Sequence, residues 1–158
     1  MDNNILAALE SITEILDGKN DSKVPYTIDT SPERFLLPYE EAEIEYERIR
    51  NSVDDISNIS LNIDKELDIV ERVKNHIFFL EHTITYQDNS TKVGRLDPDP
   101  CIVNAWDRLS NNEHISSDLV FFDHEEYESM IEKAEGLTYN EAHRRTIEAG
   151  YIWNPEEE

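Results

Sequence analysis

Apolar side chains recur every three or four positions through the middle of this chain, and this spacing constrains its fold more than any other feature. One series runs through residues 39–56 and a second through residues 59–84. Such spacing places the apolar groups on one face of a helix that packs along a partner. Hydrophobic residues make up only 38% of the chain. Because they are concentrated in these two stripes, the chain can still bury a core.

Two helical arrangements fit the stripes. Residues 54–62, between them, are rich in Asp, Ser and Asn, which prefer caps and turns to helix interiors. Residues 39–86 therefore form either one long helix or a helical hairpin that closes near residues 57–60, and the irregular spacing after residue 59 favours the hairpin. Either arrangement leaves an apolar stripe uncovered. The cover is supplied by the C-terminal helices or by a second copy in a homodimer.

The C-terminal third carries three helix-start signals. Asp99 and Pro100 form a cap and first turn for a helix that ends at Leu109. Ser117 and Asp118 open a second helix, which is predicted over residues 117–134. Thr138 and Glu141 form a capping box, which starts a third helix that ends near residue 149. Residues 83–86 are the only weak strand candidate. We therefore predict an all-α fold, in which the hairpin or long helix packs with a C-terminal three-helix unit.

The same patterns divide the chain into segments. We expect an N-terminal helix at 1–18, a linker at 19–30, a coiled-coil-like helical region at 31–95, a C-terminal helical domain at 96–153 and an acidic tail at 154–158.

Acidic residues outnumber basic residues by 36 to 14, which gives a formal net charge of −22. Such a surface repels nucleic-acid backbones and anionic membranes, so neither is an expected partner. It attracts divalent cations and basic proteins, such as a nuclease or another protein that handles nucleic acid. Carboxylates spaced along helices would imitate rows of phosphates on such a partner. The acids that we expect to face outward and bind it are Glu40, Glu41, Glu43, Glu45, Glu47, Asp54, Asp55, Asp64, Glu66, Asp68 and Glu71.

The cysteine content and the lack of a long apolar stretch predict the cellular compartment. Cys101 is the only cysteine, so an intrachain disulfide and a multi-thiolate zinc site are excluded. No apolar stretch approaches the length of a transmembrane helix, and the N-terminus lacks a basic, apolar leader. We therefore expect a cytoplasmic protein.

A polar cluster near the C-terminus predicts a site. His124 and Glu128 are four residues apart and share one helix face, and His143 reaches the same place if the chain folds back near residues 135–136. Two histidines and a carboxylate suit zinc or another divalent metal, and Glu125 would then serve as general base. Alternatively, the two histidines pair with carboxylates and only tie two helices together.

Two further histidines lie upstream of this cluster. His76 and His82 are six residues apart, a spacing that does not share a helix face, so we expect both at the surface.

Residues 96–153 resemble a C-terminal domain of bacterial polymorphic toxins and some phage-derived proteins. The resemblance follows, in order, a Leu-Asp-Pro-Asp-Pro stretch at 96–100, an Ala-Trp-Asp-Arg-Leu stretch at 105–109, the His-Glu-x-x-Glu of 124–128, the Tyr-x-x-Ala-His of 139–143 and Trp153. It implies a shared polar site at His124, Glu125, Glu128 and His143.

Two functions from different classes follow. The charge of the whole chain favours a non-enzymatic interaction protein of a phage, mobile element or toxin–immunity system, which binds and inhibits a basic partner as a nucleic-acid mimic. The alternative is a metal-dependent hydrolase-like domain that uses the histidine–glutamate site.

Overall fold

The structure is a computed structural model that describes residues 39–155, and the side chains from residue 41 onward. The predicted helix at 1–18, the linker at 19–30, the Glu40 side chain and most of the acidic tail lie outside this range. The elements, in chain order, are α1 (Tyr39–Asn51), α2 (Asp55–Ile63), α3 (Leu67–Lys74), a π-helical turn (Asn75–Phe79), β1 (His82–Thr85), β2 (Thr91–Gly94), α4 (Pro100–Ser110), α5 (Ser116–Glu135) and α6 (Tyr139–Glu148).

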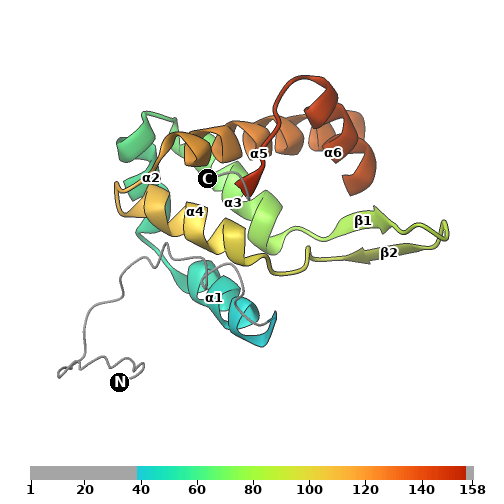
Figure 1. Ribbon diagram of the computed structural model, residues 1–158, viewed down its shortest axis with the longest axis horizontal. Coiled ribbons are helices and arrows are strands. Elements are labelled where there is room, and N and C mark those ends of the chain that lie inside the picture. The colour runs from blue at the N-terminus through green and yellow to red at the C-terminus, as the bar shows by residue number, and fades with distance from the viewer. Residues whose placement is uncertain (1–38, 156–158) are drawn as a thin grey trace.

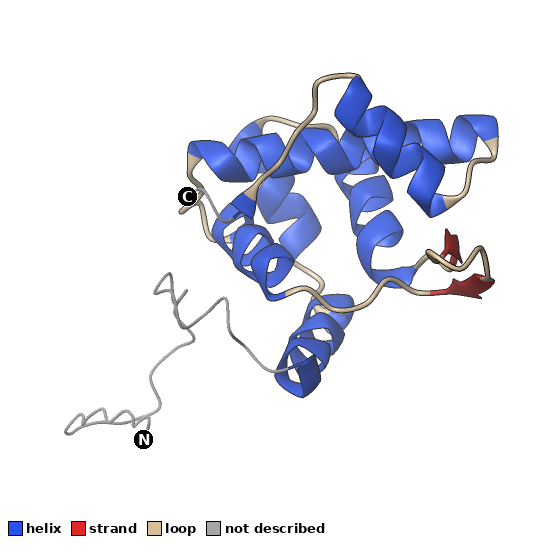
Figure 2. Ribbon diagram, turned by 45° about the vertical axis from the view of Figure 1, so that its right-hand side comes forward, coloured by secondary structure: helices blue, strands red, loops and turns tan. Residues whose placement is uncertain are grey.

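The all-α prediction is confirmed: the described residues are mostly helical, with one small two-stranded sheet (Figures 1 and 2). Helices α4 and α6 begin at the predicted caps, whereas α5 begins at Ser116, one residue before its predicted start. The Asp99 side chain accepts a hydrogen bond from the Cys101 amide at 2.9 Å, and Pro100 occupies the first turn of α4. Thr138 caps α6 in the same way, by accepting from the Glu141 amide at 3.2 Å.

The helical region turns in two places, at residues 52–54 between α1 and α2 and at residues 64–66 between α2 and α3, so the predicted closure near residues 57–60 is wrong. Helix α2 runs straight through residues 57–60, and α2 and α3 pack against each other across a turn at residues 64–66. Asp64 adopts a left-handed conformation there, with φ of 57°, which a short polar side chain tolerates. The Ser and Asn residues stay helical because Ile59 is fully buried in the core, and burial outweighs their weak propensity.

One hydrophobic core joins the N-terminal and C-terminal helices. Tyr46 from α1, Phe78 from the π turn and Trp106 from α4 meet edge to face, with ring centroids 4.8 and 5.3 Å apart. Phe121 and Phe122 of α5 complete this core. The apolar stripe of residues 46–77 is thus covered by α4 and α5 of the same chain.

Asp55, predicted to face outward, is instead buried. Its carboxylate accepts hydrogen bonds from the Lys74 ammonium at 3.0 Å and the Trp106 indole at 2.9 Å. It lies at the first turn of α2, where the helix must turn inward to bury Ile59. A charge in this position is stable because it is paired and hydrogen-bonded.

A short hairpin projects from the helical body (Figure 1). Strands β1 and β2 pair antiparallel, with His82 opposite Gly94 and Thr85 opposite Thr91. The inner strand, β1, is held to α6, since the Thr85 amide donates to the Asn140 side chain at 2.6 Å. Within residues 39–155, no helix is both long enough and apolar enough to cross a membrane.

Candidate metal centre

Four elements bring histidine and glutamate side chains together inside the fold. Helix α5 runs through the middle of the group, with the π turn and α6 packed against it and β1 packed against α6. The group consists of His76, His82, His124, Glu125, Glu128, Glu132 and His143. All but Glu132 and His143 are classed as buried.

Helix α5 supplies most of the oxygen ligands from a single face. His124, Glu128 and Glu132 follow one another at intervals of four residues, so their side chains lie one above the other. Glu128 has no exposed surface at all. A bare carboxylate in that position would be very costly unless hydrogen bonds or a cation compensated it.

The turn between α5 and α6 aims His143 at Glu128. Gly136 ends α5 in the left-handed region, with φ of 63°, which glycine adopts without strain. The Thr138 cap then starts α6 two residues later. As a result, His143 Nδ1 lies 2.9 Å from Glu128 Oε2.

His76 and His82 are buried rather than exposed, so the prediction that placed them at the surface is wrong. The helix widens into a π turn at residues 75–79, with the Leu80 amide donating to the Asn75 carbonyl. The chain then enters β1, so helical spacing no longer applies to His82. Its imidazole folds back onto the turn, with Nε2 2.7 Å from the His76 carbonyl oxygen. Such π turns often occur at functional sites.

The predicted set of His124, Glu128 and His143 converges, with one ligand atom from each residue within 4.8 Å of the others. His124 Nδ1 lies 2.7 Å from the Tyr151 carbonyl oxygen, which only accepts hydrogen bonds, so Nδ1 carries the proton. In the neutral ring, the lone pair of His124 Nε2 therefore faces Glu128 Oε2 at 3.4 Å.

A lone pair that faces a carboxylate is repulsive unless a cation lies between them. That cation is either a proton on the ring or a metal ion. Adjacent ligands of a tetrahedral zinc ion with bonds of about 2.0–2.1 Å are roughly 3.3 Å apart. The distances from Glu128 Oε2 to the two histidines, 3.4 and 2.9 Å, are close to this value. The set is therefore nearly arranged for a metal.

The ionisation states follow from the surroundings. Burial alone would raise the pKa of Glu128, but the three histidines around it outweigh burial when they donate a proton to its oxygens, and they then hold the pKa well below the usual range. Burial, together with the charge of Glu128, raises the pKa of the Glu125 carboxyl. The hydrogen bond to Glu128 raises the pKa of His143 against the opposing effect of burial. Two neighbouring carboxyl groups with opposite pKa shifts are typical of catalytic acid–base pairs.

Tyr139 lies between the two halves of the centre. Its ring stacks on His143, with centroids 5.8 Å apart, and meets His82 edge to face at 5.5 Å. Burial and the nearby carboxylates raise its pKa, so it stays a neutral hydroxyl.

The acids predicted to bind a basic partner are spread over α1, α2, α3 and the turns between them. Glu45 and Glu47 form ion pairs with Arg48 and Arg50 of the same helix, and Asp55 is buried. The remaining predicted acids with described side chains are exposed: Glu41, Glu43, Asp54, Asp64, Glu66, Asp68 and Glu71.

Sequence reasoning missed His76, His82, Glu132 and Tyr139. Glu132 carried a usable signal, because it continues the four-residue spacing from His124 through Glu128. His76 and His82 carried no such signal. His76 lies in the π turn and His82 begins a strand, so no helical period connects them.

No protein-family model matches the chain, and neither curated proteins nor solved structures show significant similarity to it. The resemblance of residues 96–153 to toxin and phage domains therefore remains a prediction.

Proposed function

We propose that this protein is a metal-dependent hydrolase that holds a divalent ion, zinc first, with His124, Glu128 and His143. One observation carries the proposal. The Tyr151 carbonyl fixes the His124 ring so that Nε2 points at Glu128 Oε2. A ligand histidine whose second nitrogen donates to a carbonyl is the usual arrangement around protein-bound zinc.

The alternative, a purely structural network, accounts for less of the geometry. A hydrogen bond that links two helices needs only one histidine for each carboxylate. Here Glu128 alone receives His76 at 2.9 Å, His124 at 3.4 Å and His143 at 2.9 Å. Three histidines around one buried carboxylate fit a set of metal ligands better than a hydrogen bond that only joins two helices.

His124, Glu128 and His143 would hold the ion and leave a coordination position for water, whose pKa a bound ion would lower. Glu125 is the residue placed to accept the proton. Its carboxylate lies 4.0 Å from His124 Nε2 on one side and 3.9 Å from His76 Nε2 on the other. Burial and the charge of Glu128 raise the pKa of Glu125, and a carboxylate with a higher pKa is a stronger base. The substrate would approach past His143, whose side chain is 41% exposed.

Metal content tests the binding part of the proposal. Protein purified without chelator should retain zinc, and His143→Ala should lose at least tenfold in zinc affinity. His114→Ala is the matched control, because it removes a histidine that lies outside the centre. Equal zinc content in all three proteins, or none in any, would contradict the proposal.

Glu125→Gln tests the catalytic part. We expect it to keep the zinc and to lose about 10²–10⁴-fold in rate, measured on a panel of ester, phosphodiester and peptide substrates with chelator-treated protein as blank. A Glu125→Gln protein as active as the parent would exclude Glu125 as the base.

A second candidate function rests on the exposed acids. Asp64, Glu66, Asp68 and Glu71 are exposed along the turn and first helical residues of α3. We propose that this acidic segment binds a basic protein, and the inhibition of a nuclease is the most direct form this would take. Reversing the charges of Glu66 and Asp68 to lysine should weaken capture of a basic partner at low salt. Capture that is unaffected by this change, or by high salt, would contradict it.

A further inference from the structure

The candidate ligands do not end at Glu128. His76, His82 and Glu132 also offer one ligand atom each, all within 4.8 Å of one another. We propose that these three residues form a second divalent-metal site beside the first. The proposal concerns residues that the hydrolase site does not use as ligands, so it can be right or wrong independently of that site.

The first argument is the orientation of His82. Its Nε2 lies 2.7 Å from the His76 carbonyl oxygen and must donate the hydrogen there. In the neutral ring the lone pair therefore sits on Nδ1, and Nδ1 lies 2.6 Å from Glu132 Oε2. A lone pair and a carboxylate oxygen at this distance require a cation, which is a proton on Nδ1 at 2.6 Å or a metal ion if the two atoms move apart to about 3.3 Å.

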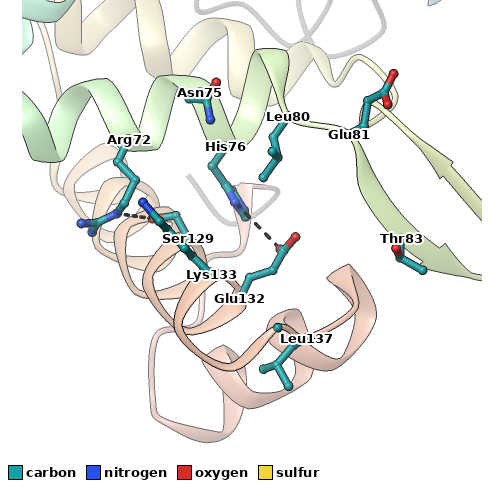
Figure 3. Close-up of a pocket in the computed structure, with 11 residues that line it drawn as sticks. Arg72, Asn75, His76, Leu80, Glu81, Thr83, Ser129, Glu132, Lys133 and Leu137 are labelled. Carbon is teal, nitrogen blue, oxygen red and sulfur yellow. Dashed lines mark hydrogen bonds and ion pairs between the residues drawn. The ribbon is translucent and has the colours of Figure 1, made fainter.

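His76 is oriented in the same sense. His76 Nε2 lies 2.9 Å from Glu128 Oε1, and a carboxylate oxygen there accepts a hydrogen bond from the ring. The lone pair of the neutral ring is then on Nδ1, which faces Glu132 Oε1 (Figure 3). The two atoms are 3.9 Å apart, too far for a hydrogen bond and wide enough for an ion between them.

An unpaired oxygen of Glu132 supports the second site independently of the orientation of the two histidines. Its side chain is only 10% exposed, yet Oε1 finds no hydrogen-bond partner anywhere in residues 39–155. A buried oxygen without a partner is costly, and such groups are rare without an unseen water or ion. A cation between His76 Nδ1 and His82 Nδ1 would satisfy it.

The surrounding groups complete the site. Each histidine would bind through one nitrogen while an acceptor holds the other, which is the outer-shell arrangement of ligand histidines. Glu128 would thus serve both sites, as a ligand of the first and as the acceptor that orients His76 for the second. Two imidazoles and one carboxylate favour zinc or ferrous iron over magnesium and calcium.

The second site is reachable from solvent. His76 and Glu132 line a cavity of about 450 Å³ that also touches Leu80 and Leu137. Figure 3 shows the two side chains pointing toward one another from opposite walls of this cavity. The cavity thus reaches two of the three ligands, His76 and Glu132, whereas His82 lies behind them.

Zinc stoichiometry by equilibrium dialysis of the full chain tests the proposal. We expect two zinc ions per parent chain, one in His82→Ala and one in Glu132→Gln, with two retained in His114→Ala. Glu132→Gln keeps the shape of the side chain, so it carries the test if His82→Ala does not fold, as judged by circular dichroism. His143→Ala identifies the remaining ion, because it should remove the first site and leave the second.

A parent chain whose stoichiometry is unchanged by Glu132→Gln would overturn the second site. That result would leave a proton, shared between His82 and Glu132, as the cation of this group. Loss of zinc in Glu132→Gln while His143→Ala has no effect would support the second site and contradict the first.

Discussion

At the scale of single residues, two neighbouring carboxyl groups of the centre have pKa values that are shifted in opposite directions. Glu128 is ionised because three histidines surround it, whereas burial beside that charge favours the protonated form of Glu125. The two residues are three positions apart on one helix, so their difference comes from the histidines that the π turn and α6 place around them. Sequence alone shows the acids but not these neighbours.

Glu125→Gln should change stability as well as rate. A buried carboxyl with a raised pKa stabilises the folded state fully below its unfolded pKa, about 4.3, and this contribution is lost as pH rises toward the folded pKa. In the presence of chelator, the parent should therefore lose up to about 1.4 kcal/mol per pH unit relative to Glu125→Gln. Denaturant unfolding at several pH values measures the difference. Glu113→Gln, at an exposed position, should show no such trend; an equal trend in both variants would contradict the explanation.

The adjacent pair Asp54 and Asp55 gives a second test at this scale. Asp55→Ala leaves the Lys74 ammonium buried without its partner, since the two side chains are each only 5% exposed. We expect a loss of about 3–5 kcal/mol in the free energy of unfolding. Asp54→Ala, one residue away and exposed, should cost less than about 0.5 kcal/mol. Similar losses for the two variants would show that the buried pair of Asp55 and Lys74 does not stabilise the fold.

At the scale of elements, the helix ends could be predicted from the sequence and the interruptions could not. Asp99, Thr138 and Gly136 are local signals: a cap or a glycine acts within four residues, so its effect can be read directly from the chain. The π turn at residues 75–79 and the turn at 64–66 depend on tertiary contacts. They let Val70, Val73 and Ile77 stay buried while the helix changes direction. The same interruptions hid His76 and His82.

Gly136 links the α5–α6 turn to the position of His143. Gly136→Ala meets no steric obstacle, because nothing lies within 4 Å of the added carbon, but its φ of 63° is unfavourable for alanine. We expect a loss of about 1–2 kcal/mol and weaker zinc binding. Gly136→Asn should lose less of both, since asparagine tolerates this conformation better. If both variants bind zinc like the parent, the turn does not control the site.

At the scale of the whole molecule, the net charge of −22 belongs to the entire chain. Several basic residues near the acids are already used within the fold: Arg108 pairs with Asp118 at 2.7 Å, and Lys65 with Glu126 at 2.6 Å. Within residues 41–155, many of the remaining acids are exposed, where they repel one another and would also draw divalent cations toward the buried centre.

Added salt should accordingly stabilise this protein. Screening shortens the range of repulsion from about 30 Å at 0.01 M to about 8 Å at 0.15 M ionic strength. The free energy of unfolding, measured with chelator present so that metal binding does not contribute, should rise over that interval. A fall in stability would show that the ion pairs of the fold outweigh the net repulsion.

The central claim is that a cation other than a proton belongs between His124, Glu128 and His143. Anomalous diffraction at the zinc edge, from crystals grown with zinc, tests it most directly. We predict a peak within about 2.0–2.2 Å of His124 Nε2, a Glu128 oxygen and His143 Nδ1. Crystals that show no peak there, with His143 still hydrogen-bonded directly to Glu128, would contradict the claim.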